Sequence, residues 1–189
     1  MRHLVLLVLV LAACREDARQ AIDPVALSSE SVGHYCQMTL LEHPGPKAQV
    51  HLQGLPGAPL FFSQVRDAIA YARLPEQSHP ILATWVNDMG APGATWEDPG
   101  ATNWIAAEAA QYVVGAAVEG GMGAPELVPF ASVDAAHAFA GVHGGTVMAL
   151  DRIPDSAVSA PVGSDGQAAG AGASDYAARL RALSRKSGG

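Results

Sequence analysis

The residues best suited to chemistry alternate within one short segment, where His34, Cys36 and Met38 follow Gly33. In an extended segment residues i, i+2 and i+4 lie on one face, so we expect these three side chains to point the same way. An imidazole, a thiolate and a thioether form a soft ligand set, which favours Cu(I) over the oxygen-seeking ions Mg²⁺, Ca²⁺ and Mn²⁺. The same pattern is also compatible with Cys36 and Met38 facing a core, as small apolar residues commonly do.

A second thioether stands in an unusual setting, because Met122 is flanked by Gly120, Gly121 and Gly123. Glycine gives the backbone conformational freedom and leaves the methionine no neighbouring side chain to pack with. We therefore predict a flexible arm that can close over a soft metal, rather than a core methionine. Met89 is a weaker candidate of the same kind.

The first residues predict export and a lipid anchor. A basic start followed by the apolar residues 4–13 is typical of a secretory signal peptide, and this run is too short for a membrane span, which needs about 20 residues. The run ends in Leu11-Ala12-Ala13-Cys14, which resembles the bacterial lipobox, so we expect residues 1–13 to be removed and Cys14 to be lipidated. The alternative is an ordinary signal peptide with a coincidental cysteine. With Cys14 as the anchor, Cys36 is the one remaining thiol, and an intrachain disulfide is excluded.

The charge distribution narrows the choice of partners. The chain has 18 acidic and 11 basic side chains, and residues 74–151 contain no lysine or arginine. Nucleic-acid binding needs basic side chains to displace counterions, so nucleic acid is excluded as a partner. An acidic body favours cations and basic docking surfaces, although solubility alone would also explain it.

The elements that must position these residues form a repeated pattern. Residues 14–31 are polar and irregular and are expected to be a membrane tether. In residues 32–86 we predict strands over 35–42 and 47–53 joined by a turn at His43-Pro44-Gly45-Pro46, a helix over 63–73 with Ser63 as N-cap, and a strand over 81–86. In residues 104–154 we predict strands over 111–118 and 125–129, a helix over 132–142 and a strand over 146–150.

The two halves also share sequence. Residues 62–72 and 130–140 align at a constant offset of 68 with five identities in eleven positions. The predicted fold class is therefore α+β, with two tandem β-β-α-β units packed together. Residues 87–103 are expected to be a linker loop, and the Gly/Ala-rich residues 155–189 a disordered tail.

Several of these segments together resemble the NosL family of nitrous oxide reductase accessory lipoproteins, over about residues 32–154. The resemblance implies a periplasm-facing lipoprotein that binds Cu(I) and supplies it for the copper centres of nitrous oxide reductase, together with a membrane ABC-type maturation complex. It also implies a pair of β-β-α-β units, Cys36, Met38 and Met122 as sulfur ligands, and His34 as a possible further ligand. Gln37 stands where many relatives have glycine. The segments that carry the resemblance are HYCQMTLLEHPGPKAQ (34–49), FFSQVRDAIAYARLPEQ (61–77), VNDMG (86–90), Trp96, Pro99-Gly100, Asn103-Trp104-Ile105 and GGMGAPELVPF (120–130).

The resulting hypothesis is a copper chaperone that is not an enzyme, anchored to a bacterial membrane, the outer membrane being favoured over the inner. One alternative is a metal-free scaffold lipoprotein that docks through its acidic face. The other is an enzyme with Cys36 as nucleophile and His34 as base, although the chain has neither a nucleophile elbow nor a second cysteine for a multi-thiol site.

Overall fold

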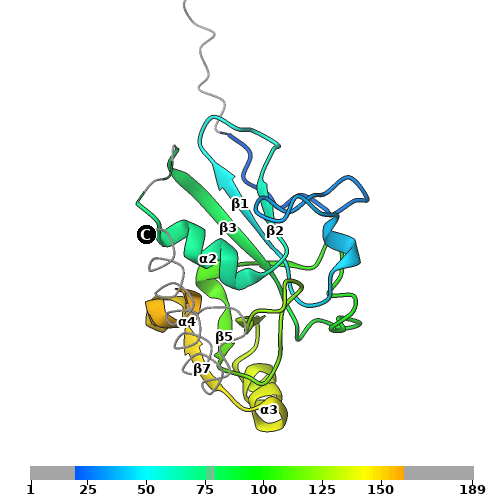
Figure 1. Ribbon diagram of the computed structural model, residues 1–189, viewed down its shortest axis with the longest axis vertical. Coiled ribbons are helices and arrows are strands. Elements are labelled where there is room, and N and C mark those ends of the chain that lie inside the picture. The colour runs from blue at the N-terminus through cyan, green and yellow to red at the C-terminus, as the bar shows by residue number, and fades with distance from the viewer. Residues whose placement is uncertain (1–19, 76, 78, 160–189) are drawn as a thin grey trace, which may run out of the picture.

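The computed structural model describes residues 20–75, 77 and 79–159, which form two antiparallel sheets with helices packed on them (Figure 1). The predicted signal peptide, the lipidation site Cys14 and residues 160–189 of the predicted tail lie outside the described residues. Among the helices of the described part, none has both the length and the apolar character needed to cross a membrane.

The first sheet has the strand order β2-β1-β3-β4, with β1 Ala48–Leu52, β2 Leu60–Phe62, β3 Ile81–Asn87 and β4 Trp104–Ala106. Helix α2, Val65–Arg73, packs on β1, β2 and β3. All five residues of β1 are buried, as expected of a central strand that is covered on both faces. The predicted strands over 47–53 and 81–86 and the helix over 63–73 are confirmed, although Gln64 rather than Ser63 is the N-cap.

The predicted strand over residues 35–42 is wrong. Residues 34–36 form a turn and Leu40–Glu42 form the short 3-10 helix η1, while the hairpin partner of β1 is β2. A hairpin between residues 35–42 and β1 is not possible, because β1 pairs with β2 along one edge and with β3 along the other.

The second sheet repeats the topology of the first. Its order is β6-β5-β7, with β5 Gln111–Val114, β6 Val128–Phe130 and β7 Thr146–Ala149, and helix α3, Val133–His143, connects β6 to β7. In both sheets the first strand of the unit lies between the second strand and the strand that follows the helix. The α+β fold of two β-β-α-β units is therefore confirmed. Strand β4 lies within residues 104–154, which we assigned to the second unit. It instead pairs with β3 at the edge of the first sheet.

The two units share one apolar core. Phe62 and Val65 of the first unit pack with Tyr112 and Leu127 of the second, and a smaller core lies under α3. The 3-10 helix η2, Ala107–Ala109, connects β4 to β5. The 3-10 helix η3, Leu150–Arg152, and the short helix α4, Asp155–Ser159, follow β7. Helix α4 packs on α2 and buries Val158, so the ordered part extends beyond residue 154.

Residues 20–27, which we call the N-terminal strap, pack on the first sheet instead of extending away as a tether. The buried amide of Gln49 accepts from Val25 N at 2.8 Å and donates to Val25 O at 3.0 Å, and Leu27 is buried. A buried amide needs partners for both of its polar atoms, and the backbone of the strap supplies them. Residues 20–27 therefore belong to the domain and not to the membrane tether that we predicted over residues 14–31.

Candidate metal centre

Cys36 lies in a tight loop rather than in an extended strand. The loop is closed by hydrogen bonds from Gly33 N to Met38 O at 2.9 Å and from Gln37 N to Gly33 O at 2.8 Å. The expectation that His34, Cys36 and Met38 share the face of a strand is therefore wrong. Gly33 has room for the cysteine only because it has no side chain, since a Cβ at Gly33 would overlap Cys36 Sγ.

Gln37 adopts φ +55°, the one positive φ of a non-glycine residue in the described part of the chain. A left-handed conformation costs an ordinary residue roughly 1–2 kcal/mol. The side chain of Gln37 offsets this cost locally, because its Nε2 donates to His34 O at 2.7 Å and to Gly33 O at 3.3 Å. A glycine at position 37 would adopt the same conformation without strain.

Met122 lies at the tip of a turn over residues 120–123. The turn is held by hydrogen bonds from Gly120 N to Ala124 O at 2.8 Å and from Gly123 N to Gly120 O at 2.9 Å. A Cβ at Gly121 would lie 2.7 Å from His43 Cβ and 3.1 Å from the backbone oxygen of Pro44. Close packing, rather than the freedom of an arm, is thus the physical reason for glycine at this position. The side chain of Met122 itself is 39% exposed.

The two loops bring Cys36 and Met122 to one pocket. The pocket has a volume of about 210 Å³, and its lining is completed by five residues: Tyr35, Gln64, Arg66, Asp67 and Ala124. Cys36 is half-buried and forms no disulfide. Cys36 and Met122, from distant segments, therefore line one small cavity at the surface.

Met38 and His34 are placed differently. Met38 is 41% exposed and neighbours the thiol through its backbone, with Cys36 Sγ 4.0 Å from Met38 O. The ring of His34 packs in an aromatic cluster, with its centroid 5.6 Å from those of Phe62 and Tyr71. Neither side chain lines the pocket that Cys36 and Met122 share.

A buried carboxyl group supports the Met122 turn from below. Glu126 Oε1 accepts from Leu127 N at 2.8 Å and from Arg66 N at 3.0 Å, in the first turn of α2. Burial raises the pKa of the Glu126 carboxyl to about 8. Gln64 lies beside Glu126 beneath the turn, and its Nε2 donates to Ala124 O at 3.3 Å. The turn of the second unit is in this way tied to the helix N-terminus of the first.

The donors at this pocket suit a soft metal ion and not a hard one. Thiolate and thioether sulfur select Cu(I), whereas Mg²⁺ and Ca²⁺ need several oxygen ligands. Among the described residues there is no group of three or more His, Cys, Asp or Glu side chains that could hold a metal. The residues of this pocket that could hold a soft metal ion are Cys36 and Met122, and Met38 is the nearest further sulfur donor along the chain.

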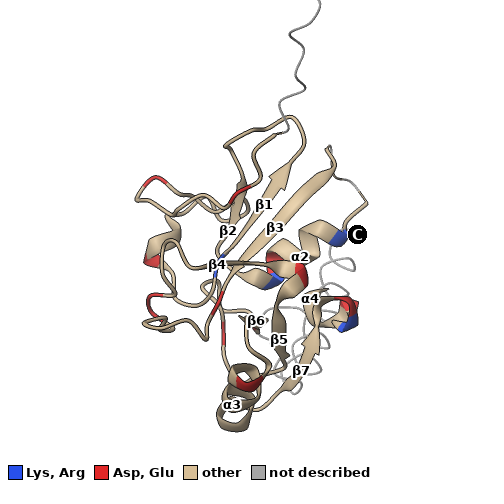
Figure 2. Ribbon diagram, turned by 180° about the vertical axis from the view of Figure 1, so that it is seen from behind, with Lys and Arg blue, Asp and Glu red and all other residues tan. Residues whose placement is uncertain are grey.

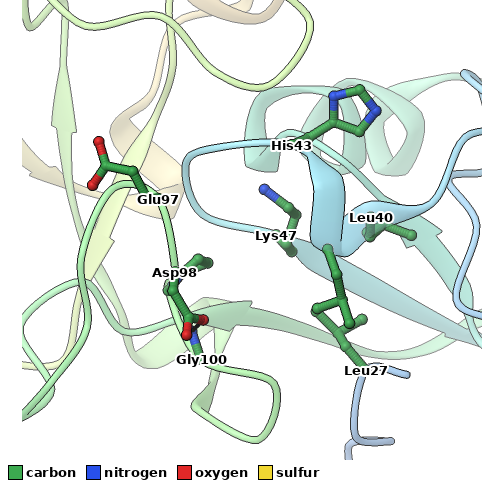
Figure 3. A pocket seen from close by; sticks show the side chains of 9 residues that line it. Leu27, Leu40, His43, Lys47, Glu97, Asp98 and Gly100 are labelled. Atoms are coloured by element: carbon green, nitrogen blue, oxygen red, sulfur yellow. Dashed lines mark hydrogen bonds between the residues drawn. The ribbon is translucent and has the colours of Figure 1, made fainter. Parts of the chain in front are cut away.

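A second cavity of about 290 Å³ lies beside η1 and has a different chemistry (Figure 3). Lys47 lines it together with His43, Glu97 and Asp98. The lysine ammonium donates to the backbone oxygens of Pro44, at 2.9 Å, and Gly45, and burial lowers its pKa to about 8. An ammonium group at the wall disfavours a metal cation, so this cavity suits a metal ion less well than the pocket lined by Cys36 and Met122.

Acidic residues outnumber basic ones in the described part of the chain. Figure 2 shows Asp and Glu on several loops and helices, with few Lys and Arg. Of the basic side chains within the described ranges, Lys47 and Arg66 are buried, and Arg73 pairs with Asp155 at 2.8 Å. Such a surface attracts cations and the basic surfaces of partner proteins.

Sequence reasoning missed three residues that shape the site: Gly33, Gln64 and Glu126. The available signal for Glu126 was its position directly after a proline and within an apolar segment. A carboxyl group there must either be buried or end the segment. No local signal marks Gly33, since its role depends on where the sulfur of Cys36 lies.

Comparison with known proteins adds independent evidence. The model of the family described as NosL matches residues 24–158. A copper-binding lipoprotein NosL from Achromobacter cycloclastes is 61% identical over 180 residues, covering 95% of this chain and 92% of that protein. Another from Stutzerimonas stutzeri is 35% identical over 152 residues, covering 79% and 76%. The crystal structure of the copper chaperone NosL from Shewanella denitrificans is similar with a TM-score of 0.64 and 28% identity, covering 70% of this chain and 96% of that one. These names describe metal-binding proteins and not enzymes, in agreement with the predicted absence of catalysis.

Proposed function

This chain belongs to the NosL family, and on that premise we propose that it binds copper as Cu(I) and delivers it for assembly of the copper centres of nitrous oxide reductase. The observation that carries the proposal is the shared pocket of Cys36 and Met122. A cysteine and a methionine from separate loops that line one cavity suit a soft monovalent metal ion.

Cys36 is the anchoring ligand in this proposal, because only its thiolate contributes a negative charge. Binding of Cu(I) would release the thiol proton. Met122 is a neutral thioether ligand from the opposite loop. Met38 is the third sulfur ligand that we propose, and His34 would have to leave its contacts with Phe62 and Tyr71 in order to bind.

Delivery requires that a partner can reach the metal. Tyr35, Met38 and Met122 expose between 39% and 51% of their surfaces around the cysteine. An accessible thioether can be replaced stepwise by a ligand of the acceptor, which makes release fast even where binding is tight. The acidic surface favours an acceptor with a basic rim, and we assign that role to the reductase and its membrane ABC-type maturation complex.

The relatives in this family are named as lipoproteins. We therefore propose that Cys14 is the lipid anchor and that the domain faces the periplasm, on the outer membrane rather than the inner. Replacement of Cys14 by serine should move the protein from the membrane fraction to the soluble fraction while its copper affinity is unchanged.

The decisive experiment is native mass spectrometry of the mature protein with Cu(I), combined with competition against a chromophoric Cu(I) chelator. We expect one Cu(I) per chain, strong preference over Zn²⁺, and weaker binding in Met122→Leu. Met148→Leu is the matched control, because Met148 lies in β7 and packs against the core. Equal copper affinity in wild type and Met122→Leu would remove Met122 from the site, and no copper binding at all would favour the scaffold hypothesis.

Delivery needs a separate test. In a denitrifying strain that lacks this chain, the copper content of purified nitrous oxide reductase should fall, and the wild-type chain should restore it while Cys36→Ala does not. A reductase with full copper content in the deletion strain would contradict the delivery role but not copper binding.

A further inference from the structure

The end of the domain where the described chain begins carries an exposed loop without charge. Residues 53–58, which connect β1 to β2, are all exposed, and none of them is Asp, Glu, Lys or Arg. Leu55 at the tip is 37% exposed. Figure 1 shows this loop beside the point where the chain enters the domain, at the end opposite α3.

The N-terminal strap fixes that entry point to the loop. Gln20 Nε2 donates to Leu52 O at 2.7 Å, and Gln20 Oε1 accepts from Gly54 N at 2.8 Å. Two residues further on, Ile22 O accepts from Trp85 Nε1 at 2.8 Å. The direction in which the chain leaves the domain is therefore determined by packing and not by a free linker.

The chain between Cys14 and this point is short. From Cys14 to Gln20 there are six peptide steps, which span at most about 21 Å when fully extended. A domain of roughly 140 residues has a radius of gyration of about 14 Å, which corresponds to a diameter of about 37 Å. A lipid on Cys14 therefore cannot reach the bilayer when the end that carries residues 53–58 faces away from it, because the chain would then have to span about the full diameter of about 37 Å.

Charge favours the same orientation. Bacterial membranes carry anionic lipids, which repel the acidic surfaces elsewhere on the domain. The loop itself is uncharged, and residues 15–19 between it and the anchor contain two arginines and two acids. Leucine, alanine and proline side chains at the tip can enter the interfacial region without desolvating a charge.

We propose that residues 53–58 are a membrane-contact surface that rests on the phospholipid bilayer and holds the anchored domain upright, with α3 directed away from the membrane. The proposal rests on the lipidation of Cys14 that is part of the proposed function. Its consequence is that the copper pocket is presented in one orientation to partners at the membrane instead of sampling all directions.

The test uses the mature chain with Cys36→Ser, coupled through Cys14 to a maleimide-bearing lipid in phosphatidylcholine vesicles that also contain phosphatidylglycerol and spin-labelled lipid. Tryptophan is introduced in Leu55→Trp and, as the matched control, in Val142→Trp on α3, where Val142 is 79% exposed. After subtraction of the signal of the parent protein, we expect quenching about twofold stronger or more at position 55 than at 142, because interfacial side chains lie about 5–10 Å into the headgroup boundary.

Equal quenching at the two positions, or stronger quenching at 142, would overturn the proposal. Hydrogen exchange of the parent protein gives a second measurement that needs no substitution, and vesicle coupling should slow exchange at the Leu55 and Ala58 amides but not in α3. Unchanged exchange in residues 53–58 would count equally against it. Because the lipid is attached chemically, these outcomes do not depend on natural lipidation, which the Cys14→Ser fractionation tests, nor on copper binding, which the chelator competition tests.

Discussion

The packing of the Met122 turn can be tested most directly through Gly120→Ala. A Cβ at Gly120 would overlap Gln64 Nε2 and Glu126 Oε2 and would lie 2.9 Å from Gln64 Cγ. Both side chains are almost completely buried, so neither can swing into solvent to make room. The methyl group must therefore displace either the turn or the layer beneath it.

The expected cost follows from these contacts. Overpacking a buried site costs about 1–3 kcal/mol. Moving Glu126 also weakens its hydrogen bonds from Arg66 N and Leu127 N, and a buried polar group that loses its partner costs about 1–3 kcal/mol. We expect Gly120→Ala to lower the free energy of unfolding by about 3 kcal/mol in total, and to weaken Cu(I) binding because Met122 moves with the turn.

Gly123→Ala in the same turn is the control. Gly123 has φ +71°, and nothing lies within 4 Å of the position that its Cβ would take. The expected cost is only that of the left-handed conformation, about 1 kcal/mol. Urea unfolding of the copper-free proteins should thus separate the two variants by about 2 kcal/mol, with an unchanged m-value. Equal losses of stability, or a fully stable Gly120→Ala, would show that a packed layer does not hold the turn.

Three further predictions concern neighbouring groups. Cys36→Ala should reduce Cu(I) affinity about a thousandfold and Met38→Leu about tenfold, measured by chelator competition, because only the thiolate carries charge; equal losses would refute this ranking. The pKa of Glu126 is about 8 in the folded protein against an ordinary value of 4.5, so the folded state binds more protons between these pH values and stability falls as pH rises through them, by up to about 1.4 kcal/mol per pH unit. Urea unfolding of Glu126→Gln should lack that fall between pH 5 and 8, and an unchanged pH profile would show that Glu126 does not titrate there. Gln37→Gly should change the free energy of unfolding by less than about 1 kcal/mol, since relief of the positive φ offsets the lost side-chain hydrogen bonds, and a larger loss would mean that those bonds hold the loop.

Much of the fold was predictable because its signals are local. The second unit follows its sequence pattern closely, from β5 through α3 to β7, and Ser132 is the N-cap of α3, accepting from Ala135 N at 3.4 Å. A helix cap and an apolar periodicity depend on residues a few positions apart, which the sequence displays directly. The repeat of residues 62–72 at 130–140 likewise predicted the two β-β-α-β units, while their shared strand order is seen only in the structure.

The errors in the first unit arose where partners are distant in sequence. Residues 35–42 alternate like a strand, yet the hairpin that we predicted between them and β1 cannot form, because β1 already pairs with β2 on one side and β3 on the other. The alternation of apolar and polar residues within a segment cannot show whether the edge of the intended partner strand is free to pair. The N-terminal strap was missed for the same reason, since its anchor, the buried amide of Gln49, is defined only once the sheet has formed.

For the candidate site, the sequence by itself indicated the type of chemistry: Cys36, Met38 and Met122 carry sulfur donors that favour a soft metal ion, because donor softness is a property of the side chain alone. Only the tertiary structure decided which donors meet. It places Cys36 and Met122 at one pocket and packs His34 against Phe62 and Tyr71, and it explains Gly120 and Gly121 by close approach rather than by mobility. Convergence of separate loops is set by the packing of two sheets around a shared core, and that packing is not encoded in the spacing of any one motif.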